Sequence, residues 1–144
     1  MKPIVFGCIT VVAALAVGGC AIPSAKPNPS KKGFPSAAIS RKILEQTDIP
    51  GSDEELRLML IEFPPHTASA PHTHPVGGLC YVVVGMAESQ YEGEDLKTFH
   101  AGDSYQDLAS IRHLVFRNAS DTDPLKFVCA AKIRKDQAFM VPVP

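Results

Sequence analysis

Short stretches of alternating apolar and polar residues occupy most of the chain after residue 39, which is the pattern of half-buried β-strands. In the clearest stretch, every second residue from Leu125 to Ile133 is apolar, and lysines occupy two of the positions between them. The pattern predicts strands over 41–49, 56–63, 79–84, 87–91, 95–99, 103–106, 112–118 and 125–133, with proline- and glycine-containing turns between them. No amphipathic helix of useful length competes. We therefore expect an all-β domain, a closed antiparallel barrel or sandwich.

The composition fits one such domain. The chain has 144 residues, of which 45% are hydrophobic and 20% charged, enough for a single core. Thirteen prolines and ten glycines suit many short strands joined by tight turns. Fourteen lysines and arginines against 15 acidic residues leave a net charge of −1, and no basic stripe is present. Nucleic acid is therefore not an expected partner, and a homodimer is left open.

The first 20 residues have the order of an export signal: Lys2, an uncharged apolar stretch from Ile4 to Val17, and small residues ending at Cys20. The sequence Val17-Gly18-Gly19-Cys20 resembles the lipobox of bacterial lipoproteins, in which the cysteine is lipidated and becomes the first residue. An uncleaved membrane anchor is the alternative, but the Gly-Gly-Cys ending favours the lipoprotein. Both interpretations place the domain outside the cytoplasmic membrane. By analogy with Gram-negative sorting, Ala21 favours the outer membrane, facing the periplasm.

Residues 21–38 are rich in proline, serine and lysine and lack periodic apolar residues. This composition is typical of an extended tether, which at this length would reach roughly 50 Å. We therefore expect three segments: a signal peptide over 1–20, a tether over 21–38 and a β-barrel over 39–144. The expected contact with the membrane is the lipid on Cys20.

Two histidines, His72 and His74, stand one residue apart just ahead of an apolar run. Alternate residues of a strand face the same side, so the two rings are expected to point together. Neutral imidazole is a common ligand for zinc, iron, copper and nickel. A polar loop with two hydrated rings is the alternative, and the pair alone does not decide between them.

Further along the chain, Gly102 opens one expected strand and His113 begins another. Together these features resemble the cupin family, jelly-roll barrels with the motifs Gly-x5-His-x-His-x3,4-Glu-x6-Gly and Gly-x5-Pro-x-Gly-x2-His-x3-Asn. His72 and His74 match the paired histidines and Gly85 the closing glycine of the first motif. Gly102 and His113 match the glycine and histidine of the second. The resemblance implies a cupin-type antiparallel jelly-roll barrel that holds a divalent metal on His72, His74 and His113.

The sequence departs from these motifs most clearly at Gly78, which stands at the glutamate position, so the ligand set is reduced to three imidazoles. The other departures are His66 for the first glycine, Leu108 for the proline, Ser110 for the second glycine, and Asn118 one residue late. Cupins such as cysteine and gentisate dioxygenases similarly hold iron on three histidines without a carboxylate. If position 78 is a vacated ligand position, Gly78→Glu is expected to restore a carboxylate on the strand face of His74.

Three neutral imidazoles would leave a divalent ion with its full charge and an additional open position. The expected ligand or substrate is then a small organic molecule that is anionic or chelating. Fe(II) is the metal that the resemblance favours for catalysis, while Mn, Ni and Zn are left open because imidazoles bind all of them.

Two classes of function follow from such a site. One is a three-His iron dioxygenase, and the other is a non-catalytic module that binds a small ligand or metal. A barrel that has lost its metal is a further alternative. No general base lies beside the histidines in sequence, which speaks against proton-transfer chemistry.

Further candidates for the pocket are Gly78, Cys80, Val82, Cys129 and Arg112. Arg112 either attracts an anion to the mouth or lies on the surface, and His66 and His100 are expected to be exposed. Once the signal and the lipidated cysteine are set apart, Cys80 and Cys129 are left, and their strand phase points both inward. Two buried thiols, a disulfide and a thiolate beside the metal are the three alternatives.

Overall fold

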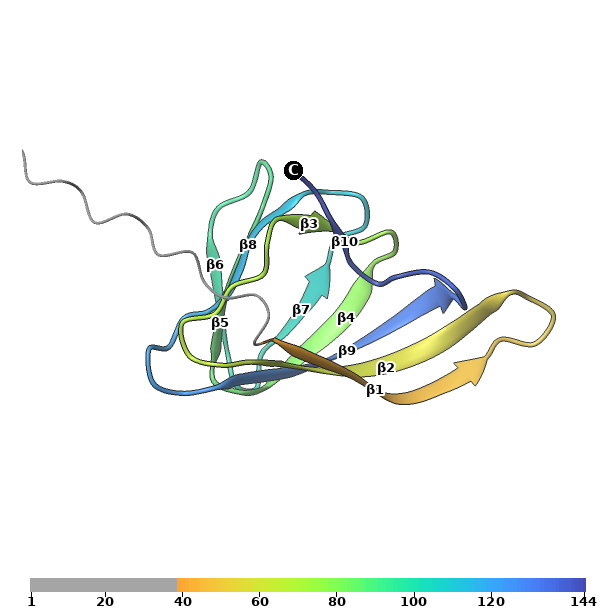
Figure 1. Cartoon of the computed structure of the whole chain (residues 1–144), viewed down its shortest axis with the longest axis horizontal. Coiled ribbons are helices and arrows are strands. Elements are labelled where there is room, and N and C mark those ends of the chain that lie inside the picture. The colour runs from red at the N-terminus through yellow and green to blue at the C-terminus, as the bar shows by residue number, and fades with distance from the viewer. Residues whose placement is uncertain (1–38) are drawn as a thin grey trace, which may run out of the picture. The chain divides into compact units, whose positions relative to one another are not determined.

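The computed structural model describes residues 39–144, which form two antiparallel five-stranded sheets (Figure 1). The first sheet has the order β1 (Ser40–Asp48), β2 (Glu54–Phe63), β9 (Leu125–Arg134), β4 (Gly78–Val84), β7 (Ser104–Asp107). The second has the order β10 (Val141–Pro142), β3 (His72–Thr73), β8 (His113–Asn118), β5 (Met86–Tyr91), β6 (Lys97–His100). The expected signal peptide, Cys20 and tether lie outside the described residues.

The eight strands expected from the alternating pattern are all present, each within two residues of its expected ends. β10 was not expected, because so short a segment has no measurable periodicity. A strand was expected at the paired histidines, and β3 covers only His72 and Thr73 of it. Residues 39–144 include no helix that is long and apolar enough to cross a membrane. The prediction of an all-β antiparallel barrel is confirmed.

An aromatic cluster fills the space between the two sheets. Phe63 of β2 lies 5.5 Å from Phe116 of β8 and 5.8 Å from Phe127 of β9, measured between ring centroids. These rings are almost fully buried, and such burial contributes most of the favourable free energy of folding. Phe116 also contacts the ring of His113, at 5.2 Å between centroids. The apolar core therefore continues directly into the histidines.

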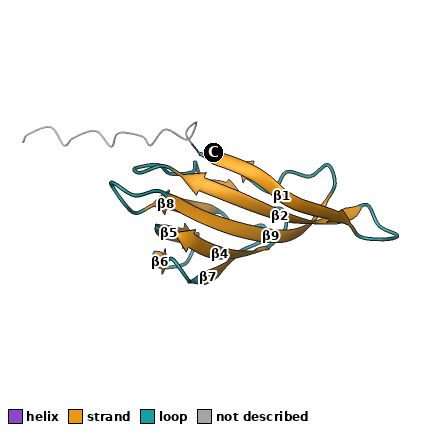
Figure 2. Ribbon diagram, turned by 90° about the horizontal axis from the view of Figure 1, so that it is seen from below, coloured by secondary structure: helices purple, strands orange, loops and turns teal. Residues whose placement is uncertain are grey.

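Gly85 is the single residue between β4 and β5, where the chain passes from the first sheet to the second. Its φ of 85° is one that residues with a side chain rarely adopt. A Cβ at this position would lie 2.4 Å from the carbonyl oxygen of Pro124. Only glycine fits this crossing. Figure 2 shows β1, β2, β9 and β4 running side by side in the sheet that the chain leaves at this point.

Cys80 of β4 and Cys129 of β9 are cross-strand partners and form a disulfide, with 4.1 Å between their Cα atoms. Of the three alternatives left by the sequence, the structure has the disulfide. It joins neighbouring strands of one sheet. Both cysteines are buried, so the bridge is part of the core.

Reduction of this disulfide should lower the free energy of unfolding by about 2–4 kcal/mol, because it releases a loop with a sequence separation of 49. Denaturant unfolding with and without reductant measures the difference, and Cys80→Ala with Cys129→Ala should show the same loss. The mass of non-reduced protein should be that of the disulfide. Two free thiols in aerobically prepared protein would contradict the bridge.

Candidate metal centre

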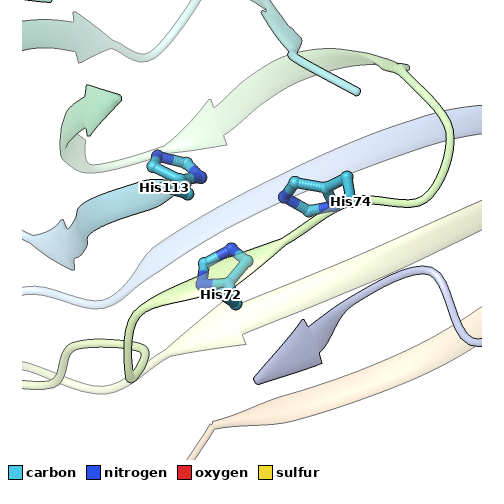
Figure 3. A group of neighbouring side chains, drawn as sticks. All are labelled: His72, His74 and His113. Carbon is cyan, nitrogen blue, oxygen red and sulfur yellow. The ribbon is translucent and has the colours of Figure 1, made fainter. Parts of the chain in front are cut away.

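The three histidines come together through the pairing of β3 with β8. His72 on β3 is the cross-strand partner of His113 on β8. His74 directly follows β3 and forms a bridge with Ala109, while the backbone N–H of Ser110 donates to its carbonyl oxygen at 2.8 Å. Figure 3 shows the three rings gathered around one space. One nitrogen of each ring lies within 4.8 Å of the other two.

Each imidazole uses one ring nitrogen to hydrogen-bond the surrounding protein. The bonds join Nδ1 of His72 to O of Ala70 (2.8 Å), Nδ1 of His74 to O of Phe139 (3.0 Å) and Nε2 of His113 to Oγ of Ser89 (2.8 Å). A carbonyl only accepts, so Nδ1 carries the proton in His72 and His74 and Nε2 keeps its lone pair. The nitrogens left free of these bonds are Nε2 of His72, Nε2 of His74 and Nδ1 of His113.

Two of these nitrogens, Nε2 of His74 and Nδ1 of His113, are buried and have no hydrogen-bond partner within residues 39–144. Leaving such atoms unpaired costs free energy, which a bound cation would offset. An imidazole held by an outer hydrogen bond on one nitrogen, with its other nitrogen turned inward, is the usual arrangement of a metal ligand. The three residues therefore fit a divalent metal.

All three rings are neutral at pH 7. Burial lowers the pKa of His72 to about 4 and that of His113 to about 3, and the neighbouring imidazoles lower the pKa of His113 further. The pKa of His74 is also lowered by burial. Neutral imidazole is the form that coordinates metal, so no proton has to be displaced on binding.

A cavity of about 260 Å³ adjoins the histidines. Its walls are mainly apolar and come from the aromatic core and from residues 138–140. Besides the histidines, the polar or charged residues that line it are Arg41, Ser69, Tyr105 and Asp107. This volume suits a small organic molecule.

The other expected pocket residues are not among those that line this cavity. Gly78, Cys80, Val82 and Cys129 are buried in the first sheet. Arg112 is half-exposed, and its guanidinium donates to the carbonyl oxygen of Pro144 at 2.6 Å. The cationic side chain at the cavity is instead Arg41 of β1, which donates to Ser69 Oγ at 3.4 Å.

Position 78 does not lie on the strand of His74. β3 ends at Thr73, and Gly78 begins β4 in the other sheet. The C-terminal segment also occupies the space above it, because a Cβ on Gly78 would lie 2.7 Å from Cζ of Phe139. The expectation that Gly78→Glu would restore a ligand on the face of His74 is therefore wrong for this fold.

Sequence reasoning missed Asp107, the last residue of β7, which is buried and lines the cavity. Its Oδ1 lies 3.7 Å from Nε2 of His74 and accepts a hydrogen bond from the hydroxyl of Tyr91 at 3.0 Å. Burial raises the pKa of Asp107 to about 6, and the bond from Tyr91 partly offsets this. A signal was present, since Asp107 shares the inward phase of Tyr105 on an alternating strand.

Tyr91 was also missed. Its ring stacks on that of His113, with 3.9 Å between the centroids, while its hydroxyl holds Asp107. It therefore links the carboxylate to one of the three imidazoles.

Gly78→Glu should weaken divalent metal binding about tenfold, because the new side chain displaces Phe139 and with it the carbonyl that holds His74. Gly78→Glu combined with Phe139→Ala removes the clash and should recover the loss. Metal titrations of the wild type and both variants measure this. A single Gly78→Glu variant that binds metal more tightly than the wild type would show that Phe139 does not block the position.

A family model described as a cupin domain matches residues 59–131. Similar solved structures include a cupin-like protein from Thermotoga maritima, at 18% identity and a TM-score of 0.58, covering 78% of this chain and 84% of that one. The polyketide cyclase RemF from Streptomyces resistomycificus has 17% identity and a TM-score of 0.59, with 78% and 76% covered.

The DMSP lyase DddQ from Ruegeria pomeroyi has 18% identity and a TM-score of 0.58, over 74% of this chain and 52% of that protein. No curated protein matches the sequence. At these identities the solved structures show a shared fold.

Proposed function

The chain belongs to the cupin family, and we propose that it is a metal-dependent cupin in which His72, His74 and His113 hold a divalent ion. One observation carries this proposal: three buried imidazoles, each hydrogen-bonded to the surrounding protein through one nitrogen, bring one nitrogen of each ring within 4.8 Å of the other two. Three such ligands leave coordination positions free for a substrate, as catalytic metal sites require.

We propose further that the ion is iron(II) and that the protein is a dioxygenase acting on a small organic molecule that is anionic or chelating. The ion, when bound, supplies Lewis acidity and a place where oxygen and substrate can meet. The chain's own residues prepare the cavity for such a substrate. Its apolar walls, including Ile61 and Phe127, exclude water, and Arg41 offers a positive charge to an anion.

The similar structures include a cyclase and a lyase, so the shared fold does not select the reaction. The proposal of oxygen chemistry rests on an ion held by three histidines with positions left free for oxygen and substrate, and on the apolar cavity.

Protein purified without added metal should contain about one divalent ion per chain, and His113→Ala should lose it, since one of the three imidazole ligands is gone. His100→Ala is the matched control, because that side chain is 67% exposed and remote from the cluster. Elemental analysis measures metal content, and circular dichroism checks that each variant is folded. Equal metal content in His113→Ala and His100→Ala would refute the site.

The same preparations test the reaction. Iron-loaded wild type should consume oxygen with at least one member of a panel of small carboxylates, thiols and dihydroxy aromatic acids, and folded His113→Ala should not. Metal-loaded protein that binds such a compound without consuming oxygen or changing it would instead be a binding module.

For the location of the protein we propose an envelope lipoprotein, anchored by lipid on Cys20 and held clear of the membrane by residues 21–38. The residues Val17-Gly18-Gly19-Cys20 support this proposal. The disulfide between Cys80 and Cys129 supports it independently, because disulfides persist mainly in oxidising compartments outside the cytoplasm.

Cys20→Ala should release the protein from the membrane fraction or block its processing, since the acceptor of the lipid is absent. Fractionation of cells, with mass spectrometry of the mature amino terminus, measures both. A mature wild-type chain that keeps Lys2 or carries no lipid would contradict the anchor.

A further inference from the structure

A buried carboxylate lies directly opposite the position where the ligand glutamate is missing. Asp107 on β7 is the cross-strand partner of Gly78 on β4. Its side chain is only 5% exposed, and the residue lines the same cavity as the three histidines. A carboxylate is thus present at this level of the barrel, on the neighbouring strand.

The surroundings of Asp107 provide no fixed positive charge. Within residues 39–144 no lysine or arginine forms an ion pair with it, and its basic neighbours are the imidazoles of His74 and His72, whose pKa values burial lowers. Its Oδ2 lies 3.4 Å from Sγ of Cys80, an atom that carries no hydrogen in the disulfide and so cannot donate. Burying a carboxylate without a nearby cation costs free energy of folding. A purely structural role therefore explains the presence of Asp107 poorly.

The other oxygen of Asp107 is held toward the histidines. The backbone N–H of Leu108 donates to the Tyr91 hydroxyl at 3.1 Å, and that hydroxyl donates to Oδ1 of Asp107. Oδ1 is 3.7 Å from Nε2 of His74, a nitrogen that has no hydrogen-bond partner. Two donor atoms bound to one ion at about 2.1 Å lie at most about 4.2 Å apart, and the separation from His74 is within that limit. Asp107 is not in the group of ligand atoms that lie within 4.8 Å of one another at the histidines, so its side chain would have to move toward an ion held there.

We propose that Asp107 supplies the carboxylate of the metal centre, from β7 instead of from the glutamate position on β4. This inference rests on the proposed metal site. The carboxylate offsets one of the two charges of the ion, and the ion in turn offsets the cost of burying the carboxylate. Tyr91 acts as a positioning residue, since it orients Oδ1 and stacks on His113.

A carboxylate at the ion would change how the site attracts an anionic substrate. With Asp107 beside the ion, the centre carries one net positive charge, and Arg41 becomes the second source of positive potential at the cavity. A substrate with two anionic groups would then match the centre at one end and Arg41 at the other.

Titration of wild type, Asp107→Asn, Asp107→Ala, Asp103→Asn and His113→Ala with Mn²⁺ tests the proposal, because Mn²⁺ favours oxygen ligands. Asp107→Asn should weaken binding tenfold or more, by the loss of a carboxylate at the ion. Asp107→Ala should weaken Mn²⁺ binding to a similar extent. This second variant is needed because the amide that Asp107→Asn introduces could itself hydrogen-bond His74. Asp103→Asn makes the same change on an exposed side chain of the preceding turn and should leave binding unchanged.

Thermal unfolding of the same proteins with and without Mn²⁺ separates this role from a structural one. Without metal, Asp107→Asn should be at least as stable as wild type, because an uncompensated buried charge is removed while the bond from Tyr91 is retained. Its stabilisation by Mn²⁺ should be smaller than that of wild type. Loss of stability without metal in both Asp107 variants, with unchanged Mn²⁺ affinity, would overturn the proposal.

The outcomes for the inference and for the proposed function are distinct. If wild type does not bind Mn²⁺, the metal site itself is refuted. Suppose instead that wild type and Asp103→Asn bind Mn²⁺ and that His113→Ala does not. If both Asp107 variants then bind Mn²⁺ as tightly as wild type, the metal site stands and only the role of Asp107 is refuted.

Discussion

The register between β3 and β8 determines the geometry of the site, because it sets His72 opposite His113. β3 has only two residues and could not hold this position alone. β10 supports it on its other edge, where Val141 and Pro142 pair with Thr73 and His72. The same C-terminal segment brings the carbonyl of Phe139 to Nδ1 of His74. The end of the chain is therefore part of the site.

Burial gives the site its electrostatic character. The aromatic core lines the cavity on one side and residues 138–140 line it on another, and the burial of the site keeps the imidazoles neutral and makes Asp107 hard to ionise. Unpaired nitrogens and a carboxylate without a cation both make the domain less stable without metal. In the proposed metal centre, a divalent ion would resolve the two costs together. Stability and metal binding would then be linked in this barrel, and the disulfide beside Asp107 would help the sheet tolerate the cost.

Much of this could be predicted from the sequence, because periodicity and motif spacing are local properties. Alternation located eight strands, and the spacing of His72, His74 and His113 identified the cluster. Ser110 stands at a motif glycine and adopts a φ of 62°, so the turn before His113 keeps its glycine-like shape without glycine.

The remaining features depend on which strands become neighbours. The inward phase of Asp107 can be read from the alternation of its strand, but its place at the site is recognised only when β7 is placed beside β4. The bridge between Cys80 and Cys129 is recognised only when β4 is placed beside β9. The contact of Phe139 with Gly78 joins residues far apart in the chain, and no local pattern indicates it. The expectation for Gly78→Glu was wrong because it extended one strand from His74 through position 78, where the chain instead turns into the other sheet.

The metal centre is tested most directly by a crystal structure of the metal-loaded protein, with anomalous scattering measured at the absorption edge of the ion. We expect one ion bonded to Nε2 of His72, Nε2 of His74 and Nδ1 of His113, since the opposite nitrogens are held by Ala70, Phe139 and Ser89. An anomalous peak away from these atoms, or no peak in the cavity of protein that retains metal in solution, would contradict it.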